Sequence, residues 1–137
     1  MVLISRRSSA VVNYEYGSDL RRLYPWQGVA DPLWGSAIAS VRPREATTMH
    51  CHDEEETFII LEGEGTIVVD GVSEAIGPGD VIYLPRGSMH SVVNGSSTAK
   101  LDFLTIFWGS PEANERMLAL AAVMQRIPAS AASEDIS

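Results

Sequence analysis

The chain has 137 residues and only three histidines, and these are the side chains best suited to chemistry. His50 and His52 stand one residue apart, which in an extended segment places both imidazoles on the same face. Glu56 shares their parity if the segment continues as a strand. His90 follows after a turn-rich stretch and a short apolar run. Because imidazole and carboxylate groups both bind divalent transition metals, the spacing favours one metal site made of these four residues.

The identity of the ion would decide the chemistry. A six-coordinate metal with these ligands keeps about two positions open for substrate, water or oxygen, whereas tetrahedral zinc would need a fifth ligand or displacement of Glu56. Neutral imidazoles and one carboxylate leave a divalent ion with about one net positive charge, which suits an oxyanion. Zinc, iron, manganese and nickel all stay open at this point. Glu56 is also the candidate catalytic residue, as a general base if it can leave the metal.

Ordinary structural roles compete with this interpretation. A single histidine in a strand usually lies on the surface or in the core, and an acidic run such as residues 53–56 is usually a solvated loop. The conjunction of all three histidines with a carboxylate at strand parity favours a metal site. Cys51 has the opposite parity from its flanking histidines, so we expect a structural thiol there rather than a ligand.

The elements that must position these residues are strands. Turn signals separate seven short segments of strand-like composition, at residues 34–41, 57–61, 66–69, 72–76, 81–84, 88–93 and 101–108. The continuous apolar run at 57–61 implies a strand covered on both faces, and Asp70-Gly71 is a strong hairpin signal. Many short strands of this kind predict an all-β fold, a single antiparallel β-barrel or jelly roll.

We divide the chain into four parts. Residues 1–33 are an N-terminal arm and loop that pack on the barrel, and 34–109 are the barrel core. Residues 110–128 form a helix, because Ser110-Pro111 is a helix start and apolar residues then recur at helical spacing. Its apolar face should cover the barrel or a partner chain. Residues 129–137 are a flexible polar tail.

Composition narrows the function. The formal net charge of −8 argues against nucleic acid, whose phosphates need clustered Lys and Arg. A single cysteine excludes an intrachain disulfide and fits the cytoplasm. The first residues have the wrong charge order for a secretory signal, and no apolar run approaches the roughly 20 residues that span a bilayer, so no membrane role is expected.

The stretch from His50 to Asn94 resembles the cupin superfamily, in its compact single-domain microbial type. The first cupin motif runs Gly, five residues, His-x-His, three or four residues, Glu, six residues, Gly, and here His50, His52, Glu56 and Gly63 match it. The second runs Gly, five residues, Pro-x-Gly, two residues, His, three residues, Asn. The matching residues are Gly79, Pro85, Gly87, His90 and Asn94.

The resemblance implies a conical β-barrel and assigns the metal-ligand role to His50, His52, Glu56 and His90. One position departs from the motif: its leading glycine falls on Arg44. That glycine serves a turn, which Pro43 could provide instead.

The function expected from this resemblance is a metal-dependent enzyme acting on a small oxyanionic metabolite in specialised biosynthesis. Its chemistry is Lewis-acid (cyclase, isomerase or lyase) or oxygenase. Phe58, Tyr83 and Arg86 are the candidate substrate-binding residues. Two alternatives stay open: a cupin component that forms N–N bonds in hydrazine biosynthesis with a methionyl-tRNA-synthetase-like partner, and a non-catalytic ligand sensor. Cupins commonly form homodimers, so a homodimer is expected.

Overall fold

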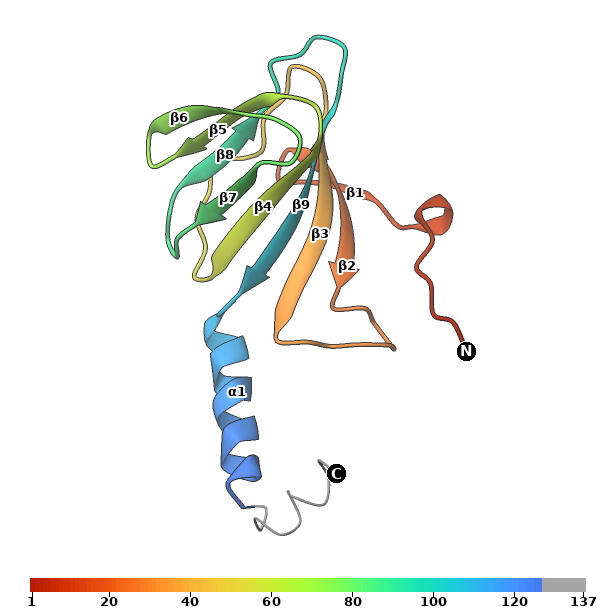
Figure 1. Cartoon of the computed structure of the whole chain (residues 1–137), viewed down its shortest axis with the longest axis vertical. Helices are drawn as coiled ribbons and strands as arrows, with labels where there is room; N and C mark the ends of the chain where they lie inside the picture. Colours follow the sequence, from red (N-terminus) through yellow and green to blue (C-terminus); the bar gives the residue numbers. More distant parts are fainter. Residues whose placement is uncertain (127–137) are drawn as a thin grey trace.

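The computed structural model describes residues 1–126, and these form two antiparallel β-sheets followed by one helix (Figure 1). The larger sheet has the strand order β1-β2-β3-β9-β4-β7 and the smaller one β6-β5-β8. The strands of the larger sheet are β1 (Asn13–Glu15), β2 (Ser18–Tyr24), β3 (Trp34–Val41), β4 (Glu55–Glu62), β7 (Val81–Leu84) and β9 (Leu101–Trp108); those of the smaller are β5 (Gly65–Val69), β6 (Val72–Ile76) and β8 (His90–Val93).

The hydrophobic core lies between the two sheets. Its most deeply buried members come from both layers: Val41, Ile60, Leu84, Val92 and Leu101 are each at most 1% exposed. Alternate residues of β4 and β9 point inward, as the burial of Phe58, Ile60 and Phe103 shows. Phe58 and Phe103 belong both to this core and to the wall of the cavity described below, so the core borders the site.

The predicted fold class is confirmed: the structure is mainly antiparallel β, with one helix at its C-terminal end. Hydrogen bonding divides the barrel wall into two sheets, as in a jelly roll. Four predicted strands have the observed bounds, namely Trp34–Val41, Val72–Ile76, Val81–Leu84 and Leu101–Trp108.

Within residues 1–33, predicted to be an N-terminal arm and loop, the prediction was wrong for residues 20–24, because β2 continues to Tyr24 and pairs with both β1 and β3. The composition misled because β2 faces a cavity rather than the core. The residues of β2 that line the cavity include the buried Ser18 and the exposed Arg22, so the strand lacks the apolar alternation that marks a half-buried strand.

The ligand loop, residues 42–54, joins β3 to β4 and is extended without being a continuous strand. Isolated bridges tie Ala46 to Val93 and His50 to His90. The motif's leading glycine position is occupied by Arg44, which itself adopts the left-handed conformation with φ +63°. The turn is therefore made at Arg44, at the steric cost that a glycine would avoid.

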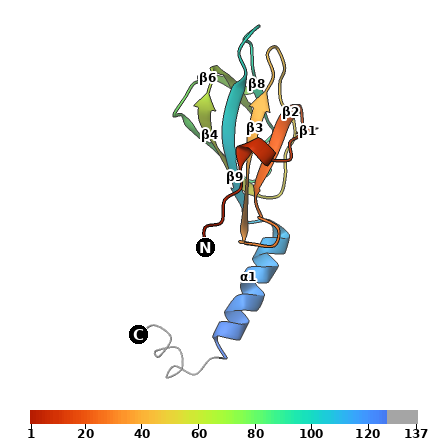
Figure 2. The same cartoon turned by 90° about the vertical axis from the view of Figure 1, so that its right-hand side faces the viewer.

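Helix α1 (Pro111–Met124) begins as predicted. The Ser110 side chain accepts a hydrogen bond from the Ala113 backbone N–H, and proline occupies the first turn. The helix ends at Met124, so it is shorter than the predicted 110–128, and the predicted tail lies outside the described residues. Helix α1 projects away from the barrel (Figure 2), and none of its residues is buried. Of the two expected roles of its apolar face, covering its own barrel is therefore excluded, and covering a partner chain stays a prediction. No helix within residues 1–126 has the length and apolarity needed to cross a membrane.

Candidate metal centre

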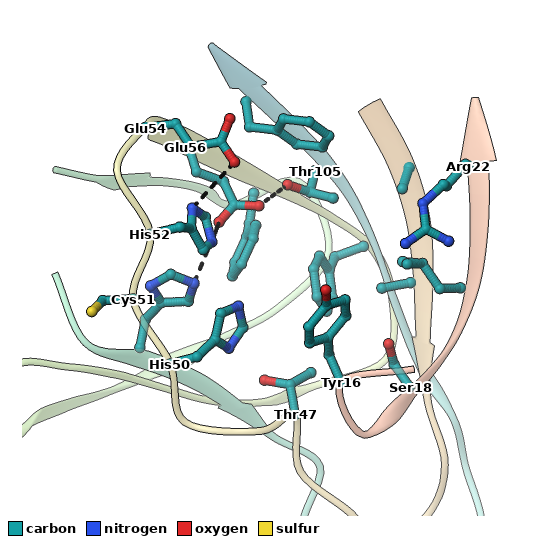
Figure 3. A pocket seen from close by; sticks show the side chains of 17 residues that line it. Tyr16, Ser18, Arg22, Thr47, His50, Cys51, His52, Glu54, Glu56 and Thr105 are labelled. Carbon is teal, nitrogen blue, oxygen red and sulfur yellow. Dashed lines mark hydrogen bonds and ion pairs between the residues drawn. The ribbon is translucent and has the colours of Figure 1, made fainter. Parts of the chain in front are cut away.

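The three histidines meet at one end of the barrel interior (Figure 3). His50 and His52 come from the ligand loop, and His90 begins β8. Their ring centroids lie 4.8–5.2 Å apart, and one possible ligand nitrogen from each lies within 4.8 Å of the others. The backbones of His50 and His90 exchange hydrogen bonds of 3.0 and 3.3 Å, so the sheet itself brings these two rings together.

Backbone carbonyls fix the tautomers of two histidines. His50 Nδ1 lies in hydrogen-bond contact with the Thr48 carbonyl oxygen, and His90 Nδ1 lies 3.0 Å from that of Ser88. Because a carbonyl can only accept, each Nδ1 must carry the proton and donate it. Each Nε2 is then left with a free lone pair. A histidine that binds a metal through one ring nitrogen usually donates the N–H of the other to a carbonyl in this way.

Glu56 directs a carboxylate oxygen at two of the histidines. Its Oε1 lies 3.2 Å from His52 Nε2 and 3.3 Å from His90 Nε2. Two ligands of one ion, each about 2.1 Å from it, are separated by roughly 3.0–3.4 Å, which these distances match. The other oxygen, Oε2, accepts a hydrogen bond from the Thr105 hydroxyl.

Burial favours the neutral form of His52. Burial lowers the pKa of His52, and the neighbouring His90 and His50 lower it further, while Glu56 acts in the opposite direction. Glu54, whose Oε1 lies 3.5 Å from His52 Nδ1, has its pKa raised by burial and then by the charge of Glu56. The neutral imidazole is the metal-binding form.

A cavity of about 440 Å³ opens beside the histidines (Figure 3). The residues at its metal end include the three histidines, Glu54 and Glu56. Its apolar wall contains Leu20, Phe58, Phe103 and Phe107. The cavity is therefore large enough for a small organic molecule with an apolar body.

Of the three predicted substrate-binding residues, only one lines the cavity. Phe58 lines the cavity, whereas Tyr83 and Arg86 are not among its lining residues. Tyr83 donates a 2.6 Å hydrogen bond to Glu55 on the outer surface. Arg86 donates to the backbone carbonyl oxygens of Asp53 and Gly109, and so joins the ligand loop to the end of β9. A substrate role for these two residues stays a prediction.

The N-terminal hairpin, β1–β2, contributes to the cavity wall, which was not predicted from the sequence. Tyr16, Ser18, Leu20 and Arg22 all line the cavity, and the Tyr16 ring stacks on His50 with centroids 5.5 Å apart. The hairpin turns at Tyr16 and Gly17, which are left-handed with φ +54° and +78°, and Gly17 was the sequence signal for this turn.

Comparisons with known proteins agree with this architecture. A protein from Photorhabdus luminescens superposes with a TM-score of 0.72 at 30% identity, over 89% of this chain and 98% of its own. The polyketide cyclase RemF from Streptomyces resistomycificus superposes with a TM-score of 0.67 at 28% identity, over 78% of this chain and 79% of its own.

Among sequence relatives, 5-aminosalicylate 1,2-dioxygenase from a Comamonas species is 37% identical over 65 residues. That match covers 47% of this chain but only 17% of the relative, so the chain corresponds to a small part of that enzyme. Residues 37–107 match the cupin domain family, a span that contains the histidines, Glu56 and most of both sheets. The chain therefore belongs to the cupin family.

Proposed function

We propose that the chain is a metal-dependent enzyme acting on a small oxyanionic metabolite. His50, His52, Glu56 and His90 would hold one divalent ion, and the adjoining cavity would hold the substrate. The supporting observation is a pair of buried atoms, His90 Nε2 and Glu56 Oε1, which have no hydrogen-bond partner among the described residues and lie 3.3 Å apart.

These two atoms test whether the residues fit a metal. Leaving a buried polar atom unpaired costs about 1–3 kcal/mol, and native proteins seldom tolerate it. Here one atom is a nitrogen lone pair and the other a carboxylate oxygen, so a cation between them satisfies both. The two atoms cannot hydrogen-bond to each other, because the tautomer of His90 leaves its Nε2 without a proton and both atoms are therefore acceptors. The donor set therefore fits a divalent ion of the zinc, iron, manganese or nickel class.

When bound, the ion would supply a Lewis acid, or an oxygen-binding centre if it is iron. The protein supplies the rest. The carbonyls of Thr48 and Ser88 hold the histidine tautomers, Phe58 and the other apolar residues exclude water, and Glu56 could accept a proton on a carboxylate oxygen. The names of the two relatives, a 5-aminosalicylate 1,2-dioxygenase and a polyketide cyclase, support the oxygenase and cyclase alternatives respectively.

Metal analysis of protein purified without added metal is the first test. We expect close to one transition-metal ion per chain, and loss of that ion in the double variant His50→Ala, His90→Ala. Unchanged metal content in this variant would overturn the proposal. Incubation of iron-loaded protein with 5-aminosalicylate and gentisate, with oxygen uptake as the readout, then tests oxygenase activity. A tightly bound ligand recovered unchanged would instead support a sensor.

We also propose a homodimer in the cytoplasm. The exposed apolar residues of α1, which include Met117, Leu118, Leu120 and Val123, leave a surface that a second copy could cover. The single free cysteine suits a reducing compartment. Light scattering at micromolar concentration, on the full chain and on Leu118→Glu, distinguishes dimer from monomer.

A further inference from the structure

The side of the cavity across from His52 and Glu56 is built by the hairpin β1–β2 (Figure 3). Alternate residues of β2, namely Ser18, Leu20 and Arg22, line the cavity. The hairpin precedes residues 37–107, which match the cupin family. The metal end of the cavity is thus made by the family motifs, and the opposite wall by a segment outside them.

Arg22, whose side chain is 53% exposed, gives that wall a positive charge at a point open to solvent. Of the residues that line the cavity, all of them within the described part of the chain, Arg22 is the only arginine or lysine. Its Nη1 pairs with the carboxylate of Glu15, a residue that does not line the cavity. Within residues 1–126, Nε and Nη2 of Arg22 donate no hydrogen bond. A guanidinium has five donor hydrogens, so Arg22 can keep Glu15 and still bind a second carboxylate.

The charges of the cavity are arranged in two separated groups. Glu54 and Glu56 lie at the metal end, where a divalent ion would outweigh the ligand carboxylate, and Arg22 lies at the other end. The rest of the lining includes apolar side chains, among them Leu20, Phe103 and Phe107. Such a cavity suits a molecule with an apolar middle and an oxygen function at each end.

We propose that Arg22 is an anion subsite, which binds a carboxylate of the substrate remote from the group that reaches the metal centre. The substrate class is therefore a small organic acid with an apolar body, one end on the metal and a carboxylate on Arg22. This inference rests on the proposed function, because it takes the metal centre as the other anchor.

A purely structural role for Arg22 makes a different prediction. If the guanidinium only holds the hairpin through Glu15, then Arg22→Gln and Glu15→Gln remove the same ion pair and must have the same effect. If Arg22 binds substrate, Glu15→Gln keeps carboxylate binding or strengthens it, because the guanidinium becomes free, whereas Arg22→Gln abolishes it. Arg21→Gln is the matched control, since it makes the same charge change on the opposite face of β2.

Three probes share one chelating group and differ in a remote carboxylate: catechol, 3,4-dihydroxybenzoate and 3-(3,4-dihydroxyphenyl)propanoate. Their affinities are measured by calorimetry on Zn²⁺-loaded protein, because zinc is redox-inactive and leaves the probes intact. We expect at least one carboxylated probe to bind about tenfold more tightly than catechol, the advantage typical of a charge-assisted hydrogen bond. Arg22→Gln should remove this advantage without changing catechol affinity, and Glu15→Gln and Arg21→Gln should retain it.

The outcomes separate this inference from the proposed function. Catechol bound through the metal, with no advantage for either carboxylated probe, overturns the role of Arg22 and leaves the metal centre standing. Equal losses in Arg22→Gln and Glu15→Gln also overturn it, in favour of the structural role. A protein that takes up no Zn²⁺ and binds none of the probes overturns both proposals.

Discussion

Thr105 donates its hydroxyl hydrogen to Oε2 of Glu56, from β9 to the adjacent strand β4. Thr105 is 6% exposed and Glu56 equally so, so the bond is protected from water. It occupies one carboxylate oxygen and leaves Oε1 directed at His52 and His90. The hydroxyl thereby sets the rotation of the carboxylate toward the metal centre.

Thr105→Val should therefore weaken metal binding while keeping the shape of the side chain. Loss of a group that orients a ligand typically costs about 10–100-fold in metal affinity, and we expect a loss in that range. Chelator competition with Zn²⁺ measures it. Thr105→Ser restores the hydroxyl and should recover most of the affinity. Equal affinities in Thr105→Val and the unaltered chain would contradict this orienting role.

Metal binding should depend on Glu56 and not on the neighbouring Glu55. Glu56→Gln replaces the carboxylate oxygen that lies near two histidines by a neutral amide, so metal affinity should fall by at least about tenfold. Glu55→Gln is the control, because Glu55 points to Tyr83 on the surface and should keep its metal. Equal metal content in both variants, by elemental analysis, would remove Glu56 from the proposed ligand set.

The ligand candidates could be predicted because they depend on local spacing. His50, His52 and Glu56 fall within one short segment, and His90 follows a turn motif of fixed length. Thr105 could not be predicted, since its position beside Glu56 depends on strand pairing between residues 49 apart in sequence. Arg22 was missed for another reason: an arginine on the cavity side of β2 interrupts the apolar alternation by which strands are recognised.

Arg86 should hold the ligand loop in place against the end of β9. It donates hydrogen bonds of 2.8 Å to the Asp53 carbonyl oxygen and 2.6 Å to that of Gly109. Arg86→Gln removes this bridge, so we expect a lower melting temperature and faster metal release, measured by calorimetry and by chelator-trapped dissociation. Should the variant instead retain both while losing affinity for the carboxylated probes, Arg86 would be a substrate residue after all.

The bidentate pair between Arg42 and Asp19, with N–O distances of 2.8 and 3.0 Å, holds β2 beside the end of β3. Hydrogen bonding to Arg42 lowers the pKa of Asp19 below its ordinary 3.8. A carboxyl whose pKa is lower when folded adds stability above about pH 3.8, and loses it as pH falls through the folded pKa. Asp19→Asn should therefore destabilise at pH 7, with a difference that shrinks below pH 3.8. Urea unfolding across this range tests it; a difference independent of pH would contradict it.

Replacing Arg44 by the glycine of the cupin motif should stabilise the fold. A non-glycine residue in the left-handed region costs about 1–2 kcal/mol, and glycine avoids this at the expense of extra chain entropy when unfolded. Arg44 is exposed with φ +63°, and we expect Arg44→Gly to gain roughly 0.5–1 kcal/mol in free energy of unfolding. Arg44→Ala is the control, because alanine removes the same side chain but keeps the steric cost. If glycine and alanine gave equal stability in chemical denaturation, the gain would come from loss of the arginine side chain, and backbone strain at this turn would not be its cause.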